Sequence, residues 1–136
     1  MTKRILSCGA GGAPALNFIR SLRKAKEKFY ITGITCNKYD LIKAKRHVSK
    51  VFLVPPAKDK NYISVLQQII KEEKSNFLHA QNDEEVVVIS RNRNKLGVKT
   101  YLPSHEVVEL CQDKFKSAQI WSKSGLNVPE TYLINN

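Results

Sequence analysis

The fold is decided by residues 4–14, which read Arg4-Ile5-Leu6-Ser7-Cys8-Gly9-Ala10-Gly11-Gly12-Ala13-Pro14. An apolar, strand-like run stops at the glycines, and a helix-like spacing of apolar residues follows at Ala15, Phe18, Leu22 and Ala25. Glycines let the backbone turn tightly and bring amide groups toward a ligand at the start of a helix. The stretch therefore predicts a strand, a tight loop and a helix, and the loop is the first place to look for a bound group.

The rest of the chain repeats this alternation of strands and helices. Four more strands are predicted in short apolar segments, at residues 30–35, 51–54, 77–80 and 99–102. Helices are expected between them, the first capped by Asp40 and the last, residues 83–96, ended by Gly97. Such alternation implies parallel strands joined by right-handed crossovers. The predicted fold class is α/β: a doubly wound, Rossmann-like parallel sheet of about five strands in a three-layer arrangement.

The C-terminal part carries its own signals. A helix capped by Ser104 is expected through Leu110, and Asp113 is expected to cap a second helix that ends at Gly125. Residues 128–134 resemble a strand that begins without a partner. The predicted division is a Rossmann-like domain of residues 1–111, followed by a helix and strand of residues 112–136 that lead into a missing domain.

Composition limits the function classes. The chain has 23 Lys and Arg against 12 Asp and Glu, for a net charge of +11, which suits nucleic acid, an acidic partner or an anionic substrate such as ATP. The basic stretches carry few aromatics suited to base stacking, so nucleic-acid binding is not expected. Three widely spaced cysteines favour a reduced, cytoplasmic setting. No apolar run approaches the roughly 18 residues that cross a bilayer, so no membrane anchor is expected.

The glycine loop leaves two interpretations open. Gly9 and Gly11 match the first two glycines of a dinucleotide fingerprint, but Pro14 stands at the third position. The acidic residue that would bind the ribose is missing after the second predicted strand, although Lys38 could accept the 2′-phosphate of NADP. The loop is therefore either an NAD(P) site or a structural turn.

An acidic triplet, Asp83-Glu84-Glu85, follows the fourth predicted strand at the same edge of the sheet. Its carboxylates could bind a substrate amine or a metal ion, or could serve only as cap and dipole partners of the helix. Cys8 lacks a base that the sequence places within reach, and the three histidines lack metal-ligand spacing. We therefore predict no catalytic residue and no metal site.

Four segments, in their order along the chain, resemble the leading domain of ATP-grasp ligases. They are Cys8-Gly9-Ala10-Gly11-Gly12-Ala13-Pro14, Asn82-Asp83-Glu84-Glu85, Gln112-Asp113-Lys114-Phe115 and Gly125-Leu126-Asn127-Val128-Pro129-Glu130-Thr131. The Asp-Lys pair ahead of the Gly-x-x-x-Pro-x-Thr segment is the most specific combination. The resemblance covers nearly the whole chain and is greatest to the carbamoyl-phosphate-synthase group, with biotin carboxylase more distant.

The resemblance implies a carboxylate–amine or carboxylate–ammonia ligase, in which ATP phosphorylates a carboxylate and a nucleophile displaces the phosphate. Later subdomains would hold ATP and Mg²⁺, so neither is expected on this chain, which should not be catalytic alone. The residues expected to bind substrate are Gly9, Gly11, Gly12, Asp83 and Glu84. Lys114 matches a family position whose side chain reaches an ATP phosphate, while an ordinary lysine on a helix surface is the alternative.

The implied partners are a small carboxylate substrate and the downstream ATP-grasp domain, and a homodimer is compatible with this assignment. Two other functions stay open at this point. The chain could be the NAD(P)-binding domain of an oxidoreductase or a sugar-modifying enzyme, or a non-catalytic module that binds through its basic surface.

Overall fold

The chain divides into two compact units, the first ending at Leu102 and the second beginning at Pro103. A computed structural model describes residues 2–134. The contacts of the helix that follows Ser104 group it with the C-terminal unit, and the predicted division into domains after residue 111 stays a prediction.

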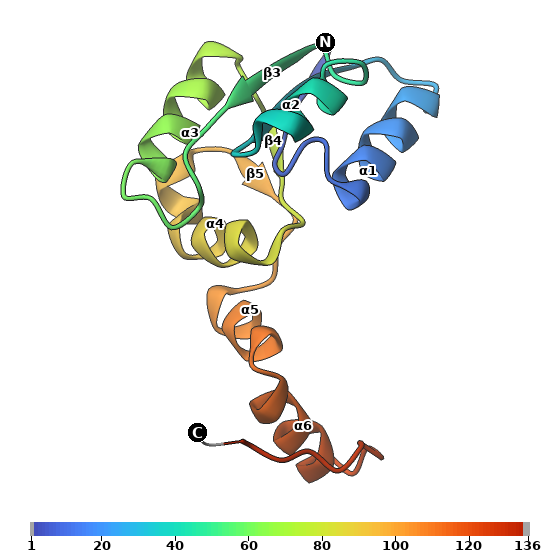
Figure 1. The fold of residues 1–136 in the computed structure, drawn as a ribbon, viewed down its shortest axis with the longest axis vertical. Coiled ribbons are helices and arrows are strands. Elements are labelled where there is room, and N and C mark those ends of the chain that lie inside the picture. The colour runs from blue at the N-terminus through green and yellow to red at the C-terminus, as the bar shows by residue number, and fades with distance from the viewer. Residues whose placement is uncertain (1, 135–136) are drawn as a thin grey trace. The chain divides into compact units, whose positions relative to one another are not determined.

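Five parallel strands form one sheet in the first unit, in the order β3-β2-β1-β4-β5 (Figure 1). The strands are β1 Lys3–Ser7, β2 Phe29–Thr35, β3 Lys50–Leu53, β4 Phe77–His79 and β5 Lys99–Thr100. Strand order reverses between β1 and β4, because the chain leaves one edge of the sheet after β3 and returns beside β1. The predicted α/β class with a five-stranded parallel sheet is confirmed.

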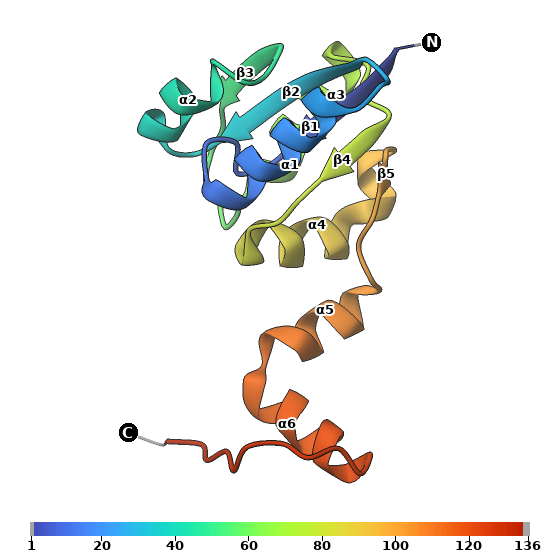
Figure 2. The same ribbon diagram turned by 90° about the vertical axis from the view of Figure 1, so that its right-hand side faces the viewer.

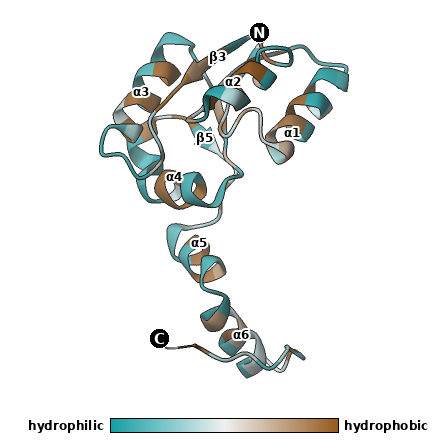
Figure 3. Ribbon diagram, in the orientation of Figure 1, coloured by the Kyte–Doolittle hydropathy of each residue, from teal (hydrophilic) through white to brown (hydrophobic). Residues whose placement is uncertain are grey.

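Helices cover both faces of this sheet (Figures 1 and 2). They are α1 Ala13–Lys24, α2 Lys38–Ala44, α3 Tyr62–Glu72 and α4 Asp83–Leu96. One core packs under α1 and α2, around Ile19, Ile31 and Ala44, and a larger one packs under α3 and α4, around Leu66 and Ile89. Each helix carries hydrophobic and hydrophilic sides, as a helix lying on a sheet requires (Figure 3).

Asn37, not Asp40, caps α2. The Asn37 side chain accepts a hydrogen bond from the Tyr39 amide at 2.8 Å, and Asp40 lies inside the first turn. The predicted cap was wrong because Asn and Asp favour both positions, and only the backbone conformation separates them. At the far end of α4, Gly97 has a φ of +62°, which confirms the predicted stop.

The second unit contains α5 His105–Gln112 and α6 Lys114–Lys123. Both predicted caps are confirmed, since Ser104 accepts from the Val107 amide and Asp113 from the Lys116 amide. Residues 128–134, predicted as a strand that begins without a partner, join no ladder in the described part of the chain. A strand without a neighbour gains no ladder hydrogen bonds.

None of the described helices is long and apolar enough to cross a membrane.

Two glycines allow the loop after β1 to lie close to its neighbours. A Cβ added to Gly33 would lie 2.8 Å from the Cβ of Ala10. Strand β2 therefore has room for no side chain at the position where the loop crosses it. Gly11 has a φ of +104°, and a Cβ there would lie 2.2 Å from the backbone oxygen of Asp40 in α2. The loop can therefore adopt this position only with glycine at both sites.

Substitution of Gly11 tests this packing. Gly11→Ala combines an unfavourable φ with a collision against backbone, and we expect it to lower the free energy of unfolding by about 3 kcal/mol. Gly97→Ala is the matched control, because Gly97 also has a positive φ but nothing lies within 4 Å of the added Cβ. It should cost about 1 kcal/mol. Urea unfolding followed by circular dichroism measures both, and equal losses would contradict the predicted contact between Gly11 and α2.

Candidate functional site

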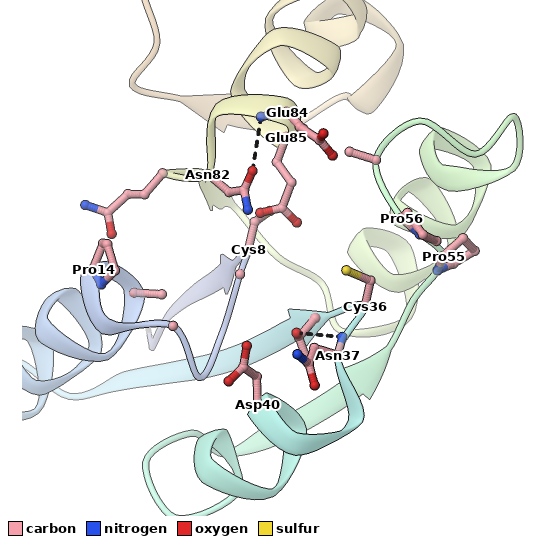
Figure 4. A pocket seen from close by; sticks show the side chains of 16 residues that line it. Cys8, Pro14, Cys36, Asn37, Asp40, Pro55, Pro56, Asn82, Glu84 and Glu85 are labelled. Atoms are coloured by element: carbon pink, nitrogen blue, oxygen red, sulfur yellow. Dashed lines mark hydrogen bonds between the residues drawn. The ribbon is translucent and has the colours of Figure 1, made fainter.

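A cavity of about 350 Å³ opens at the carboxyl edge of the sheet, where strand order reverses (Figure 4). Ligands of open α/β sheets bind at this position, outside the strand ends. The loops after β1, β2, β3 and β4, with the helix starts that follow them, supply its walls. The lining residues are Cys8, Gly9, Gly12, Pro14, Ala15, Thr35, Cys36, Asn37, Asp40, Pro55, Pro56, Ala57, Gln81, Asn82, Glu84 and Glu85.

The glycine loop uses part of its own backbone hydrogen-bonding capacity to hold its shape. The Ala10 amide donates to the carbonyl of Ile34 in β2, and the Gly12 amide donates to the carbonyl of Gly9. Pro14, in the first turn of α1, has no N–H to donate. Neither residue 12 nor residue 14 therefore offers a free amide to a phosphate at the start of α1.

On the opposite wall, the start of α4 orients the acidic triplet. Asn82 caps the helix by accepting from the Glu84 amide at 3.0 Å. The first turn then directs its three carboxylates differently: Asp83 and Glu84 are exposed, whereas the Glu85 side chain points from α4 into the cavity (Figure 4). Only Glu85 is buried, with 8% of its surface accessible.

Glu85 forms a buried cluster with Tyr62 of α3 and Cys8 of the glycine loop, which we call the Glu85 cluster. The Tyr62 hydroxyl donates to Glu85 Oε1 at 2.9 Å, and each of these two neighbours is only 1% exposed. The second carboxylate oxygen, Glu85 Oε2, is buried and has no hydrogen-bond partner. An unpaired buried oxygen on a charged group is costly and needs an explanation.

Burial raises the pKa of all three groups in the cluster. The pKa of Glu85 is raised chiefly by desolvation, while the Tyr62 hydroxyl and the nearby backbone amide of Gly9 act in the opposite direction. Burial, followed by the negative charge of Glu85, raises the pKa of the Cys8 thiol well above its usual value. Cys8 therefore stays a protonated thiol, which is a poor nucleophile.

The cavity is acidic although the chain as a whole is strongly basic. Three of its lining side chains are carboxylates, Asp40, Glu84 and Glu85, and none of the described lining residues is Lys or Arg. Two of these acids have cationic partners nearby: Lys43 Nζ lies 2.9 Å from Asp40 Oδ1, and Lys58 Nζ lies 2.6 Å from Glu84 Oε1. Tyr62 is the partner of the third, so a net negative charge faces the cavity.

The structure brings most of the predicted substrate residues to one place. Gly9, Gly12 and Glu84 line the cavity. Gly11 lies against the backbone of α2, and Asp83 is exposed and is not among the described lining residues. Their role in binding stays a prediction.

Lys114 belongs to the second unit, where its Nζ donates to the carbonyl of Cys111 at 2.8 Å. This contact is compatible with a lysine on a helix surface. Its predicted role at an ATP phosphate stays a prediction.

Sequence reasoning missed the two residues that matter most in the geometry. Glu85 was visible as the third acid of the triplet, but nothing in the sequence separated it from its exposed neighbours. Tyr62 stands at the start of a helix 23 residues earlier, and only the crossover from β3 to β4 brings it to Glu85.

No group of three His, Cys, Asp or Glu residues that could hold a metal ion occurs in residues 2–134.

No protein-family model and no curated protein matches this sequence. Solved structures do match. L-amino acid ligase from Bacillus licheniformis superposes with a TM-score of 0.67 at 14% identity, over 95% of this chain and 30% of the ligase. The biotin carboxylase domain of Hydrogenobacter thermophilus 2-oxoglutarate carboxylase, a dimer in complex with MgADP, ADP and bicarbonate, gives 0.66 at 16% identity, over 92% of this chain and 28% of that one.

These enzymes are ATP-grasp proteins, and the match covers their N-terminal domain. The resemblance seen in the sequence is thus confirmed at the level of the fold. This chain spans less than a third of their length. UDP-D-quinovosamine 4-dehydrogenase from Vibrio fischeri shares the layered architecture less closely, with a TM-score of 0.52 at 19% identity over 82% of this chain and 87% of that one.

The pH dependence of stability tests the environment of Glu85. Its pKa is higher in the folded chain than the ordinary value of 4.5, so its contribution to stability is fully present below that value and is lost as pH rises through the folded-state pKa. We expect the free energy of unfolding of Glu85→Gln, relative to that of the unaltered chain, to increase as the pH is raised from 4 to 8. Urea unfolding at several pH values measures this difference, and a difference independent of pH would contradict it.

Removal of the Tyr62 hydroxyl tests the hydrogen bond itself. Tyr62→Phe leaves Glu85 Oε1 without its donor, so we expect a loss of about 1–3 kcal/mol in the free energy of unfolding at neutral pH. The loss should be smaller at pH 4, where a protonated carboxyl is less costly to bury. In the Glu85→Gln background the same substitution should cost less, because no buried charge remains to be stabilised. A double-mutant cycle with additive effects would show that the two side chains are not coupled.

Proposed function

We propose that this chain forms the N-terminal, substrate-side domain of an ATP-dependent carboxylate–amine or carboxylate–ammonia ligase and is not catalytic alone. The observation that carries this proposal is the match of 92–95% of the chain to the N-terminal portion of two ATP-grasp enzymes. The four sequence segments that resemble such ligases support it independently.

The cavity at the strand ends would form one wall of the substrate site. In a ligase of this kind, ATP with Mg²⁺ supplies the phosphoryl group that activates a carboxylate, and both would be held by a downstream domain. The residues of this chain would then have binding roles: the backbone of Gly9, Gly11 and Gly12 would lie close to the substrate, and Asp83 and Glu84 would contact it from the start of α4. Lys114 would approach an ATP phosphate once the downstream domain is present.

The finer assignments follow from the same proposal. The substrate is a small carboxylate, the enzyme resembles the carbamoyl-phosphate-synthase group, and the protein works in the cytoplasm, in keeping with its unpaired cysteines. A homodimer is the proposed assembly, supported by the dimer formed by the matched biotin carboxylase domain.

A dinucleotide-binding domain is the second candidate, and the match to the V. fischeri dehydrogenase favours it. Three features of the cavity oppose it. Pro14 removes a donor at the start of α1, the Gly12 amide is occupied by the Gly9 carbonyl, and the lining carboxylates would repel a pyrophosphate. The ligase assignment is the better supported of the two.

Calorimetry with Mg-ATP and with NADPH separates the two candidates. We expect the 136-residue chain to bind neither nucleotide tightly, and a natural form that continues beyond Asn136 to bind Mg-ATP at least about 100-fold more tightly, a difference of roughly 2.7 kcal/mol. NADPH binding by the 136-residue chain would overturn the proposal in favour of a dinucleotide-binding protein. Mg-ATP binding that does not depend on residues beyond Asn136 would also contradict it.

A further inference from the structure

Glu85 Oε2 is a buried carboxylate oxygen without a partner at the edge of a cavity. The Tyr62 hydroxyl occupies Oε1, while Oε2 receives no hydrogen bond. A site that buries a carboxylate in this way is complete only when a hydrogen-bond donor reaches the free oxygen. Glu85 lines the cavity and its side chain points into it, but Oε2 itself is covered, so a ligand in the cavity supplies the donor only when the carboxylate turns toward it (Figure 4).

The charges around the cavity define the ligand. Asp40 and Glu84 each have a lysine within 2.9 Å, whereas Glu85 is stabilised by neutral groups, the Tyr62 hydroxyl and the backbone amide of Gly9. A cation would therefore neutralise Glu85, whereas a carboxylate or phosphate would meet three acidic side chains and no basic lining residue among those described. A metal ion is a poor alternative, because no cluster of three potential ligands occurs in the described residues.

The geometry also favours one kind of cation. A guanidinium group pairs best with both oxygens of a carboxylate, and Tyr62 already occupies one of them. An ammonium group is a compact charge with three donors and needs only one oxygen of Glu85. Asn82 and Thr35 line the same walls, and the side-chain oxygen of each already accepts one backbone hydrogen bond, from Glu84 and Asn37 respectively. At about 350 Å³, the cavity lies at the small end of ligand pockets.

We propose that this cavity binds the ammonium end of a small primary amine, with Glu85 as the binding carboxylate and Tyr62 as the positioning residue that holds it. The inference rests on the proposed function in taking the cavity as part of a substrate site, and it deepens that function by naming the group that the site binds. It assigns the binding role to Glu85, a buried residue that was not among the predicted substrate residues. The exposed Asp83 then has a smaller part in binding.

A charge series of small ligands tests the proposal on the 136-residue chain. The probes are n-butylammonium chloride, the neutral N-butylacetamide and sodium butyrate, titrated separately while backbone amide shifts are followed by NMR. We expect n-butylammonium to shift the amides of Gly9, Gly12 and Glu85 saturably, and the other two probes to bind at least about 10-fold more weakly, a difference of roughly 1.4 kcal/mol. Equal binding of butyrate or N-butylacetamide, or no shifts at these amides, would overturn the proposal.

Matched variants then identify the carboxylate. Glu85→Gln should weaken n-butylammonium binding at least about 10-fold, because an amide keeps the shape but loses the charge. Glu72→Gln makes the same change on the exposed side of α3 and should leave the affinity within about 2-fold. Unchanged affinity in Glu85→Gln would overturn the role of Glu85. If that variant does not fold, the charge series on the unaltered chain still decides.

The pH profile separates positioning from mere support of the fold. Affinity for n-butylammonium should fall as acid protonates Glu85, and Tyr62→Phe should move the midpoint of that fall to higher pH, because the hydroxyl lowers the pKa of this carboxyl. The other titratable groups facing the cavity are Cys8, Asp40 and Glu84, which are present in both proteins. An unchanged midpoint in Tyr62→Phe would remove Tyr62 from the site.

The outcomes distinguish this inference from the ligase assignment. Selective amine binding that depends on Glu85, together with NADPH binding in the calorimetry, would retain the amine site and reject the ligase. Mg-ATP binding by a longer form without any amine selectivity would retain the ligase and reject the amine site.

Discussion

The close contact between the glycine loop and β2 is the constraint on which the rest of the first unit depends. Ala10 donates to the Ile34 carbonyl and lies directly over Gly33, while Gly11 lies against the backbone of Asp40. These contacts fix where α1 begins and how far its start stands from α4. The cavity is the space that remains between them. A bulkier residue at either glycine would move the loop away from β2 and change the shape of that space.

The carboxylate buried at the cavity lowers the stability of the folded unit. A buried carboxylate is expensive, and the Tyr62 hydroxyl offsets only part of the cost because it reaches a single oxygen. A chain selected for stability alone would replace both groups by apolar residues of similar size. A buried carboxylate with a perturbed pKa at the edge of a cavity is typical of binding sites, which favours the proposed role of the Glu85 cluster.

Much of the fold could be predicted from periodicity, since alternating strands and amphipathic helices leave few arrangements other than a parallel sheet. The caps of the helices were predicted less accurately. Ser104 and Asp113 were assigned correctly, but Asp40 was predicted as the cap that Asn37 provides, because both residue types suit a helix start. The strand predicted at 128–134 was expected to lack a partner, and it joins no ladder in the described residues, because pairing is a non-local property. The pairing of Tyr62 with Glu85 was beyond prediction for the same reason, because it depends on the crossover between β3 and β4.

The fold alone leaves the activity undecided, since both a ligase and a dehydrogenase superpose on this chain. Charge at the strand ends is more informative than topology. A dinucleotide needs amide donors and tolerates few acids near its pyrophosphate, whereas here the helix start carries Pro14 and the cavity carries Asp40, Glu84 and Glu85. The net charge of +11 lies on the remaining surface and not in this cavity, so it says nothing about the ligand bound there. The lining carboxylates would attract a cationic group and repel a phosphate, so the charge of this cavity favours the proposed amine over a nucleotide.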